Sequence, residues 1–299
     1  MKKIISFKKS ALIIIGAFLI AAAGLLIYAR ECNSKIEKNF SDYKLQKKSQ
    51  GKVDISTVSL NNLEQDDLWV YEKSSKRQIL FYGNPIGQLQ FSPSGKRFGF
   101  LEYRDIYDKK TPYDEQVMLY LGEAGKKDYK IAYRGSFKTA GWEWLNENEV
   151  VAYTGCGTEC EVAFLYDTHN LKEGVELWAV GYEWSPNKQM ILSYNYSIGY
   201  GVRVQNKKGD DLFLIARDHP EFYNEFTDET TAVWSPDSGK LALVIKKEKE
   251  NAMELLVYNA KNNFKQILRA DAIYAKDQKI LWSNDSKNLV YGGLSITMN

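Results

Sequence analysis

The sequence predicts an all-β protein: a β-propeller of four-stranded antiparallel blades preceded by one N-terminal transmembrane helix. Three observations lead to this prediction. An uncharged apolar segment lies near the N-terminus, an aromatic residue followed by a turn recurs five times, and strand-like segments follow most copies. They assign residues 1–10 to a cytoplasmic basic segment, 11–28 to a transmembrane signal anchor, 29–65 to a polar linker and 66–299 to the propeller.

The composition suits a large folded body whose charge is nearly balanced. Of the 299 residues, 44% are apolar and 13% aromatic, enough to fill a sizeable core. Four of the 40 basic residues are lysines at positions 2, 3, 8 and 9, which leaves 36 basic against 38 acidic residues in the rest. Nucleic-acid binding needs a concentrated basic surface, so this composition argues against such a partner.

The segment at residues 11–28, ALIIIGAFLIAAAGLLIY, predicts the membrane anchor. At about 1.5 Å per residue, a helix of this length just crosses a hydrocarbon layer of roughly 30 Å. Four lysines precede it within ten residues, and fewer basic residues follow closely. The positive-inside rule therefore predicts a cytoplasmic N-terminus and an extracytoplasmic body, either periplasmic or at the cell surface.

Other interpretations of the N-terminus stay open. The segment could be a cleaved secretory signal, with a mediocre cleavage site at Ile27-Tyr28-Ala29, in which case the body is secreted. It could also be a buried helix of a soluble protein. Lipid attachment at Cys32 is disfavoured, because Glu31 precedes it where lipoproteins have a small residue.

Five hairpin-like segments repeat along the body. Their aromatic residues are spaced by 53, 40, 50 and 48 positions. They are Phe91, Trp144, Trp184, Trp234 and Trp282. Each copy has a strand that ends in the aromatic residue, a tight turn and a second apolar strand, which is the pattern of a β-hairpin. We expect each aromatic side chain to pack between neighbouring sheets.

The turn in VWSPDSGKLALVI (233–245) places a serine, an aspartate and a lysine close together, yet its residues suit a structural role. Proline fixes φ near −65°, and Ser and Asp side chains accept hydrogen bonds from turn amides. Gly95 and Gly239 are the residues expected to adopt positive φ. Ser235, Asp237 and Lys240 are therefore predicted to build a turn and not a reactive site.

Two further strand-like segments follow each of the first four hairpins, which gives four strands per unit and a period of 40–53 residues. The last unit lacks its second half, whereas DLWVYEK and RQILFYG within 67–83 precede the first hairpin. Joining the two ends in one shared blade predicts a closed ring of five blades without an open edge strand. Six blades follow if residues 53–60 contribute more.

The pattern W-S-P-D-x-G-K-L-A-L at 234–243 resembles the repeat of TolB-like (WD40-like) β-propellers, and the other copies match it to decreasing degrees over roughly residues 66–299. The resemblance implies a bladed propeller in the cell envelope that often works through protein contacts. The same repeat also occurs in peptidase accessory domains and sugar lyases. It therefore identifies the fold much better than the function.

If strands alternate in direction, the repeated turns lie on one face and the more varied loops on the other. Aromatic residues and charges gather in those loops, which predicts a binding surface for an envelope protein or complex, or for a saccharide. The candidate binding residues are Tyr107, Tyr113, Tyr196, Tyr200, His219, Phe222 and Tyr223. The alternative is that these are ordinary exposed loops.

Cys156 and Cys160 flank a short loop at a predicted hairpin tip, and in an oxidising compartment we expect a disulfide. Free thiols and a metal or redox pair are the alternatives. Only two histidines, His169 and His219, occur in the chain, which gives little support to a zinc site or a catalytic triad. We expect no cofactor. The enzymatic alternative is a carbohydrate-active lyase or glycosidase that uses loop carboxylates such as Asp218 and Glu221.

Overall fold

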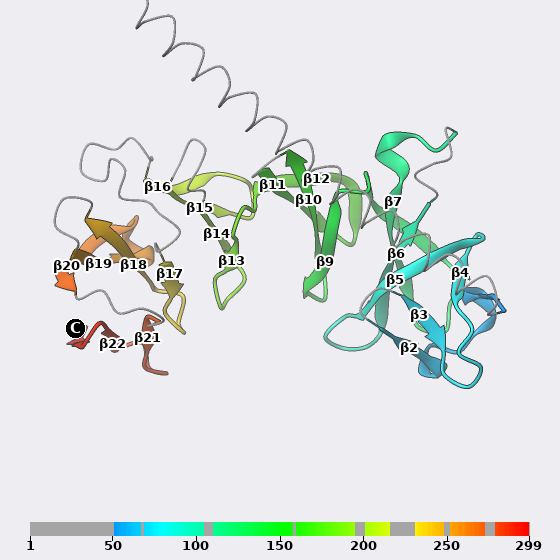
Figure 1. Cartoon of the computed structure of the whole chain (residues 1–299), viewed down its shortest axis with the longest axis horizontal. Coiled ribbons are helices and arrows are strands. Elements are labelled where there is room, and N and C mark those ends of the chain that lie inside the picture. The colour runs from blue at the N-terminus through cyan, green and yellow to red at the C-terminus, as the bar shows by residue number, and fades with distance from the viewer. Residues whose placement is uncertain are drawn as a thin grey trace, which may run out of the picture.

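Antiparallel β-sheets that follow one another in chain order form the body of the protein (Figure 1). The computed structural model describes residues 51–66, 69–104, 110–157, 160–194, 201–215, 231–247, 252–272 and 279–298. In these residues the helical elements are short 3-10 turns, which confirms the all-β prediction. None of the described helices is long and apolar enough to cross a membrane, and the predicted anchor at 11–28 lies outside the described residues.

Four sheets contain the first four repeats. The second, third and fourth have four consecutive strands as predicted, whereas the four strands of the first repeat continue into β4 (Ile79–Phe81) and β1 (Val53–Asp54) and form a six-stranded sheet. The first sheet holds β5 (Asn84–Phe91), β6 (Arg97–Tyr103), β7 (Val117–Glu123) and β8 (Tyr129–Gly135). The second holds β9 (Thr139–Asn146), β10 (Glu149–Gly157), β11 (Cys160–Asp167) and β12 (Asn170–Trp178). The third holds β13 (Glu183–Trp184), β14 (Met190–Tyr194), β15 (Val202–Asn206) and β16 (Asp211–Ile215). The fourth holds β17 (Thr231–Trp234), β18 (Lys240–Lys247), β19 (Ala252–Asn259) and β20 (Lys265–Ala272).

Shorter elements occupy the two ends of the series. The last sheet contains β21 (Leu281–Trp282), β22 (Asn288–Tyr291) and β23 (Leu294–Thr297). The N-terminal strands are β1 (Val53–Asp54), β2 (Leu63–Gln65), β3 (Val70–Glu72) and β4 (Ile79–Phe81). The 3-10 turns are η1 (Ile55–Thr57), η2 (Leu60–Asn62), η3 (Tyr113–Glu115) and η4 (Ala260–Asn262). Figure 1 shows the sheets along an arc with these two groups at its ends.

The predicted blade shared by the two ends is absent from the described strands. Tyr71 of β3 pairs with β2 on one side and with Gln78 on the other, and β4 lies between β1 and β5. In the last sheet, β22 pairs with β21 and β23, and none of the described N-terminal strands joins this sheet. The prediction of this pairing was therefore wrong for the described residues, and the number of blades stays a prediction.

Two short turns explain the difference. Tyr82 and Gly83, between β4 and β5, have φ of 49° and 84°, and Gly292 and Gly293, between β22 and β23, have φ of 55° and 80°. A two-residue loop with both residues at positive φ matches the twist of a β-hairpin and closes it locally. Each end of the series therefore forms a hairpin with its nearest neighbour in sequence.

A hydrophobic core lies between each pair of consecutive sheets. Successive residues of β10 alternate between two such cores: Val150 and Ala152 pack toward the first sheet, whereas Val151 and Tyr153 pack toward the third. The strand β18 shows the same alternation, with both of its faces buried from Leu241 to Ile245. Side chains of a strand alternate between the two faces of its sheet, so an apolar run buries both.

The repeated aromatic residues do not all pack alike. Trp184 and Trp234 are 6% and 3% exposed and lie in the cores toward the preceding sheets, as predicted. Phe91 is 45% exposed, so the prediction was wrong there. The N-terminal elements take the place of a preceding sheet: Ile55 and Leu63 pack over the face that carries Phe98 and leave Phe91 uncovered. The packed part of the chain thus includes residues N-terminal to position 66.

Candidate functional site

The two ends of the sheets differ in regularity. In Figure 1 the hairpin loops between β9 and β10 and between β13 and β14 point downward, whereas the short helical segment that precedes β7 lies at the top. We call these the turn face and the loop face. The predicted separation of repeated turns from varied loops holds for the described residues.

The turn of the fourth sheet is closed by its own side chains. The hydroxyl of Ser235 donates to Asp237 Oδ1 at 2.7 Å and accepts from the Lys240 amide at 2.8 Å. Asp237 Oδ1 also accepts from the Gly239 amide at 2.9 Å, and Lys261 Nζ lies 3.0 Å from Oδ2. Burial alone would raise the pKa of Asp237, but these hydrogen bonds and the Lys261 charge lower it well below its usual range. The side chains of Ser235 and Asp237 therefore stabilise the backbone of the turn.

Ser238, and not Gly239, adopts the left-handed conformation, with φ of 57°, so the prediction for Gly239 was wrong. Gly95 has φ of 71° as predicted. A Cβ on Gly239 would lie 2.8 Å from Asp237 Oδ2 and 3.0 Å from Lys261 Nζ. This glycine therefore makes room for the ion pair.

A non-glycine residue at positive φ is uncommon, yet Lys188 in the turn of the third sheet has the same conformation, with φ of 57°, so this conformation belongs to the geometry of the repeated turn. The serine at this position adds a contact between sheets. Ser238 Oγ accepts a hydrogen bond from the Asn187 amide of the third sheet at 3.0 Å. Ser286, with φ of 60°, accepts in the same way from the Asp237 amide at 3.0 Å. The repeated turns thus connect neighbouring sheets, which supports their structural interpretation.

The loop face carries two exposed aromatic rings in contact. Tyr113 in η3 is 57% exposed and Phe137, between β8 and β9, is 55% exposed. Their ring centroids lie 6.1 Å apart at an interplanar angle of 88°. Gln116 Oε1 accepts from the Phe137 amide at 3.0 Å and holds the two loops together. The two exposed rings in edge-to-face contact form an apolar surface at this end of the sheets.

Charged residues border this aromatic pair. Glu115 forms two ion pairs, one through each carboxylate oxygen. Arg104 Nη1 lies 3.1 Å from Oε2, and Arg134 Nη1 lies 2.8 Å from Oε1. The side chain of Arg134 is 49% exposed. We call Tyr113, Phe137, Arg104, Glu115 and Arg134 the Tyr113 patch. Aromatic and arginine side chains side by side are the residue types enriched where proteins bind one another.

The remaining candidate binding residues lie outside the described residues. They are Tyr107, Tyr196, Tyr200, His219, Phe222 and Tyr223, together with the carboxylates Asp218 and Glu221. Phe137, Arg104 and Arg134 were missed by the sequence prediction. They lie in or beside sheet strands. In such positions the sequence pattern predicts that an aromatic residue packs in the core and that a basic residue faces solvent, so neither is recognised as part of a binding site.

Cys156 of β10 and Cys160 of β11 form a disulfide, with Cα atoms 5.1 Å apart. This confirms the predicted pair and rules out two free thiols at this position. The bridge lies at the hairpin tip on the loop face, where Cys156 is exposed. Among the described residues, no group of three or more His, Cys, Asp and Glu side chains could hold a metal ion.

Tyr153 forms a buried polar contact between the second and third sheets. Its hydroxyl donates to Glu143 Oε1 at 2.5 Å and accepts from Trp184 Nε1 at 2.8 Å, and its ring stacks on Tyr182 at 4.3 Å. Burial, and then the Glu143 carboxylate, raises the pKa of Tyr153. The protein thus supplies both a hydrogen-bond acceptor and a hydrogen-bond donor for the Tyr153 hydroxyl. The phenol therefore stays neutral and links the second and third sheets.

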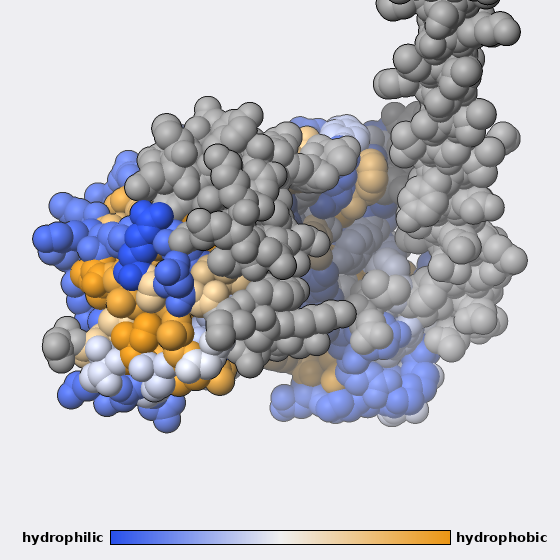
Figure 2. Space-filling model, turned by 60° about the vertical axis from the view of Figure 1, so that its left-hand side comes forward, coloured by the Kyte–Doolittle hydropathy of each residue, from blue (hydrophilic) through white to orange (hydrophobic). Residues whose placement is uncertain are grey.

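A second group of exposed apolar residues lies on the C-terminal sheets. The part turned forward in Figure 2 shows apolar residues gathered among hydrophilic ones. On these sheets Leu281, Val290 and Ile267 are 60%, 43% and 43% exposed, and Leu281 and Val290 are a cross-strand pair. Leu281 and Val290 mark the outer face of the last sheet, which no described sheet covers, and Ile267 lies on β20 of the fourth sheet.

Successive antiparallel sheets with a core between each consecutive pair define an all-β protein of the propeller type. No family model and no curated protein matches the chain. Its structural neighbours are β-propeller proteins of low identity. The Dos1 propeller is 14% identical over 76% of this chain and 58% of its own, with a TM-score of 0.38. Oligogalacturonate lyase from Vibrio parahaemolyticus is 11% identical over 74% and 62%, with a TM-score of 0.41. The uncharacterized protein lmo1340 from Listeria monocytogenes EGD-e is 12% identical over 75% and 69%, with a TM-score of 0.37.

Proposed function

We propose that the protein is a membrane-anchored, extracytoplasmic TolB-like β-propeller that binds a protein of the cell envelope through the Tyr113 patch. The exposed Tyr113–Phe137 pair carries this proposal. Rigid aromatic rings give a large contact area at a small cost in side-chain entropy. Arg134 beside them supplies a fork of hydrogen-bond donors to a partner carboxylate or carbonyl.

Two features support the location outside the cytoplasm. The Cys156–Cys160 disulfide is typical of oxidising compartments. The excess of lysines before residues 11–28 favours transfer of the body across the membrane. A C-terminal alkaline phosphatase fusion should be active and a cytoplasmic reporter fusion inactive, and the reverse result would reject the location.

Photocrosslinking in native membranes tests the binding surface. A benzoylphenylalanine placed at position 113 or 137 of the full chain should give one discrete adduct with a protein partner. The matched control is position 91 on the turn face, whose native phenylalanine is 45% exposed. Arg134→Ala should reduce the yield at position 113 because it removes the charged neighbour. Equal adducts at positions 91 and 113, or none at either loop position, would reject the proposal.

A further inference from the structure

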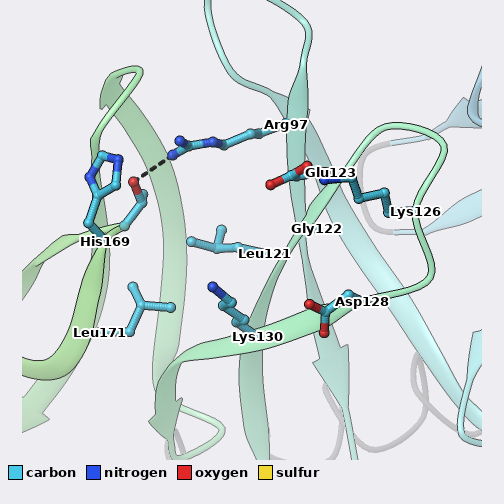
Figure 3. Close-up of a pocket in the computed structure, with 10 residues that line it drawn as sticks. Arg97, Leu121, Gly122, Glu123, Lys126, Asp128, Lys130, His169 and Leu171 are labelled. Atoms are coloured by element: carbon cyan, nitrogen blue, oxygen red, sulfur yellow. Dashed lines mark hydrogen bonds and ion pairs between the residues drawn. The ribbon is translucent and has the colours of Figure 1, made fainter.

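A pocket of about 270 Å³ lies between the first and second sheets on the turn face (Figure 3). One wall is formed by the end of β7, the turn after it and the start of β8. The other wall is the turn between β11 and β12, with Thr168, His169 and Leu171. The pocket lies at the opposite end of the sheets from the Tyr113 patch, so it is independent of the proposed function.

The floor of the pocket is apolar. Leu121 of β7 is only 7% exposed and belongs to the core between the first two sheets, and Leu171 of β12 packs against the same core. A ligand that touches these two side chains removes apolar surface from water, which favours binding. The pocket volume is at the lower end for small-molecule sites, so it suits a ligand of about one ring.

Arg97 crosses the upper part of the pocket in a fixed position. Its Nη1 donates to Thr168 Oγ1 at 2.6 Å and to the Glu147 carbonyl at 3.1 Å. Both bonds use the same nitrogen, and the guanidinium makes no other hydrogen bond to the described residues. These two hydrogen bonds fix the orientation of the guanidinium before a ligand binds. Its remaining N–H groups can then bind a ligand at a smaller cost in side-chain entropy.

Lys130 supplies the second positive charge. Figure 3 shows its ammonium group directed between Leu121 and Leu171, below Arg97. The side chain is exposed, and it forms no hydrogen bond or ion pair with the described residues. Among the acidic lining residues, Glu123 is paired with Lys126, and Asp128 is the other carboxylate. Arg97, Lys126 and Lys130 face Glu123 and Asp128, so the lining carries one net positive charge, and Glu123 also interacts electrostatically with Arg97 and Lys130.

We propose that this pocket binds a small organic carboxylate with a short apolar body. The carboxylate lies between Arg97 and Lys130, where the planar guanidinium can donate two parallel hydrogen bonds. The apolar body lies on Leu121 and Leu171. The site uses side chains from two sheets and requires their junction to be intact.

The probe is 4-fluorobenzoate, titrated into the full chain in detergent and followed by fluorine NMR. We expect saturable binding, weakened about tenfold or more by Lys130→Met because a charge-assisted contact is lost. The matched control is Lys172→Met, an exposed lysine of β12 outside the pocket, which should leave the affinity unchanged. The neutral 4-fluorobenzyl alcohol should bind about tenfold more weakly than the acid.

Three results would overturn the proposal. They are equal affinity of the wild type and the Lys130→Met variant, equal binding of the acid and the alcohol, and displacement of the probe by inorganic phosphate at lower concentration than by unlabelled benzoate. His169→Gln provides a second variant on the opposite wall, with a side chain 62% exposed and no contact with the core. Because the ligand is held by Arg97 and Lys130, this variant should lower the affinity for the acid less than Lys130→Met does, without changing the circular dichroism of the protein.

Discussion

The fourth sheet and the last sheet begin with nearly the same sequence and end in different environments. Both have Trp-Ser-x-Asp-Ser at the first turn, and Ser235 and Ser283 make the same hydrogen bonds to their turns. The fourth sheet is covered on both faces, whereas Leu281 of the last sheet is 60% exposed. The motif thus determines the hairpin, and the neighbouring sheets determine burial.

The largest test of this difference compares two leucines. Leu243→Ala on β18 should lower the free energy of unfolding by about 2–5 kcal/mol, because the side chain is fully buried. Leu281→Ala on β21 should cost less than about 1 kcal/mol, since little apolar area is lost. Denaturant unfolding of the full chain in detergent, followed by tryptophan fluorescence, measures both. Equal losses would mean that another part of the chain covers the last sheet.

The disulfide gives stability that does not depend on neighbouring sheets. The double replacement Cys156→Ser and Cys160→Ser should lower the free energy of unfolding by about 2 kcal/mol, because the five-residue loop no longer restricts the unfolded chain. The aromatic bands of the near-UV circular dichroism should stay unchanged, since the bridge lies at a hairpin tip away from the cores. A changed spectrum would show that the bridge also orders the second sheet.

Replacements of Asp237 and Asp285 compare how much the turns of the two sheets contribute to stability. Asp237→Asn should destabilise the protein by about 1 kcal/mol at pH 7, because it weakens charge-assisted hydrogen bonds. The folded state lowers the pKa of Asp237, so its contribution is complete above the unfolded pKa of about 3.9 and is lost as the pH falls below that value. Unfolding measured from pH 6 to pH 2.5 should therefore show a flatter pH dependence in the variant.

The matched replacement Asp285→Asn tests the same chemistry in the last sheet. Asp285 also has a lowered pKa, caused first by the hydrogen bond from Ser283 and then by the Lys287 amide, with a smaller contribution from the Lys287 charge. Within the described residues, no lysine forms an ion pair with Asp285 as Lys261 does with Asp237. We expect a smaller loss of stability than for Asp237→Asn. A larger loss of stability for Asp285→Asn than for Asp237→Asn would contradict this prediction.

The last comparison distinguishes two tryptophans. Trp282 Nε1 donates to the Val233 carbonyl at 3.3 Å, whereas Trp234 Nε1 is buried without a hydrogen-bond partner among the described residues. Trp282→Phe should cost about 1 kcal/mol, because a bond between the sheets is lost. Trp234→Phe should cost less, since the loss of area is offset by removal of an unsatisfied donor. Calorimetric midpoints of the two variants give the comparison.

The hairpins could be predicted from the sequence because their signals are local. The turn residues, the aromatic residue before them and the apolar run after them lie within about a dozen positions. Three of the four predicted four-stranded sheets are present, and the four strands of the first repeat are extended by β4 and β1. Pairing between the chain ends depends on contacts more than 200 residues apart. There the local turns at Tyr82-Gly83 and Gly292-Gly293 determined the strand partners instead.

The candidate site could be predicted only in part. Tyr113 stands out as an aromatic residue in a charged loop, and the structure adds Phe137 as its neighbour. That contact joins two loops of different connections, which no spacing in the sequence reveals. Arg97 and Lys130 are likewise 33 positions apart, and the two walls of the pocket come from different sheets.

The serine bonds between adjacent turns have a consequence for how the two faces can change. Ser238 and Ser286 each bridge two sheets through a short side chain, so the spacing of these sheets is determined at the turn face. Loops at the opposite end can then gain or lose residues without altering how the sheets pack. A protein with this arrangement can exchange one partner for another by loop insertion alone, and foreign peptides grafted after β6 or β10 should leave the scaffold intact.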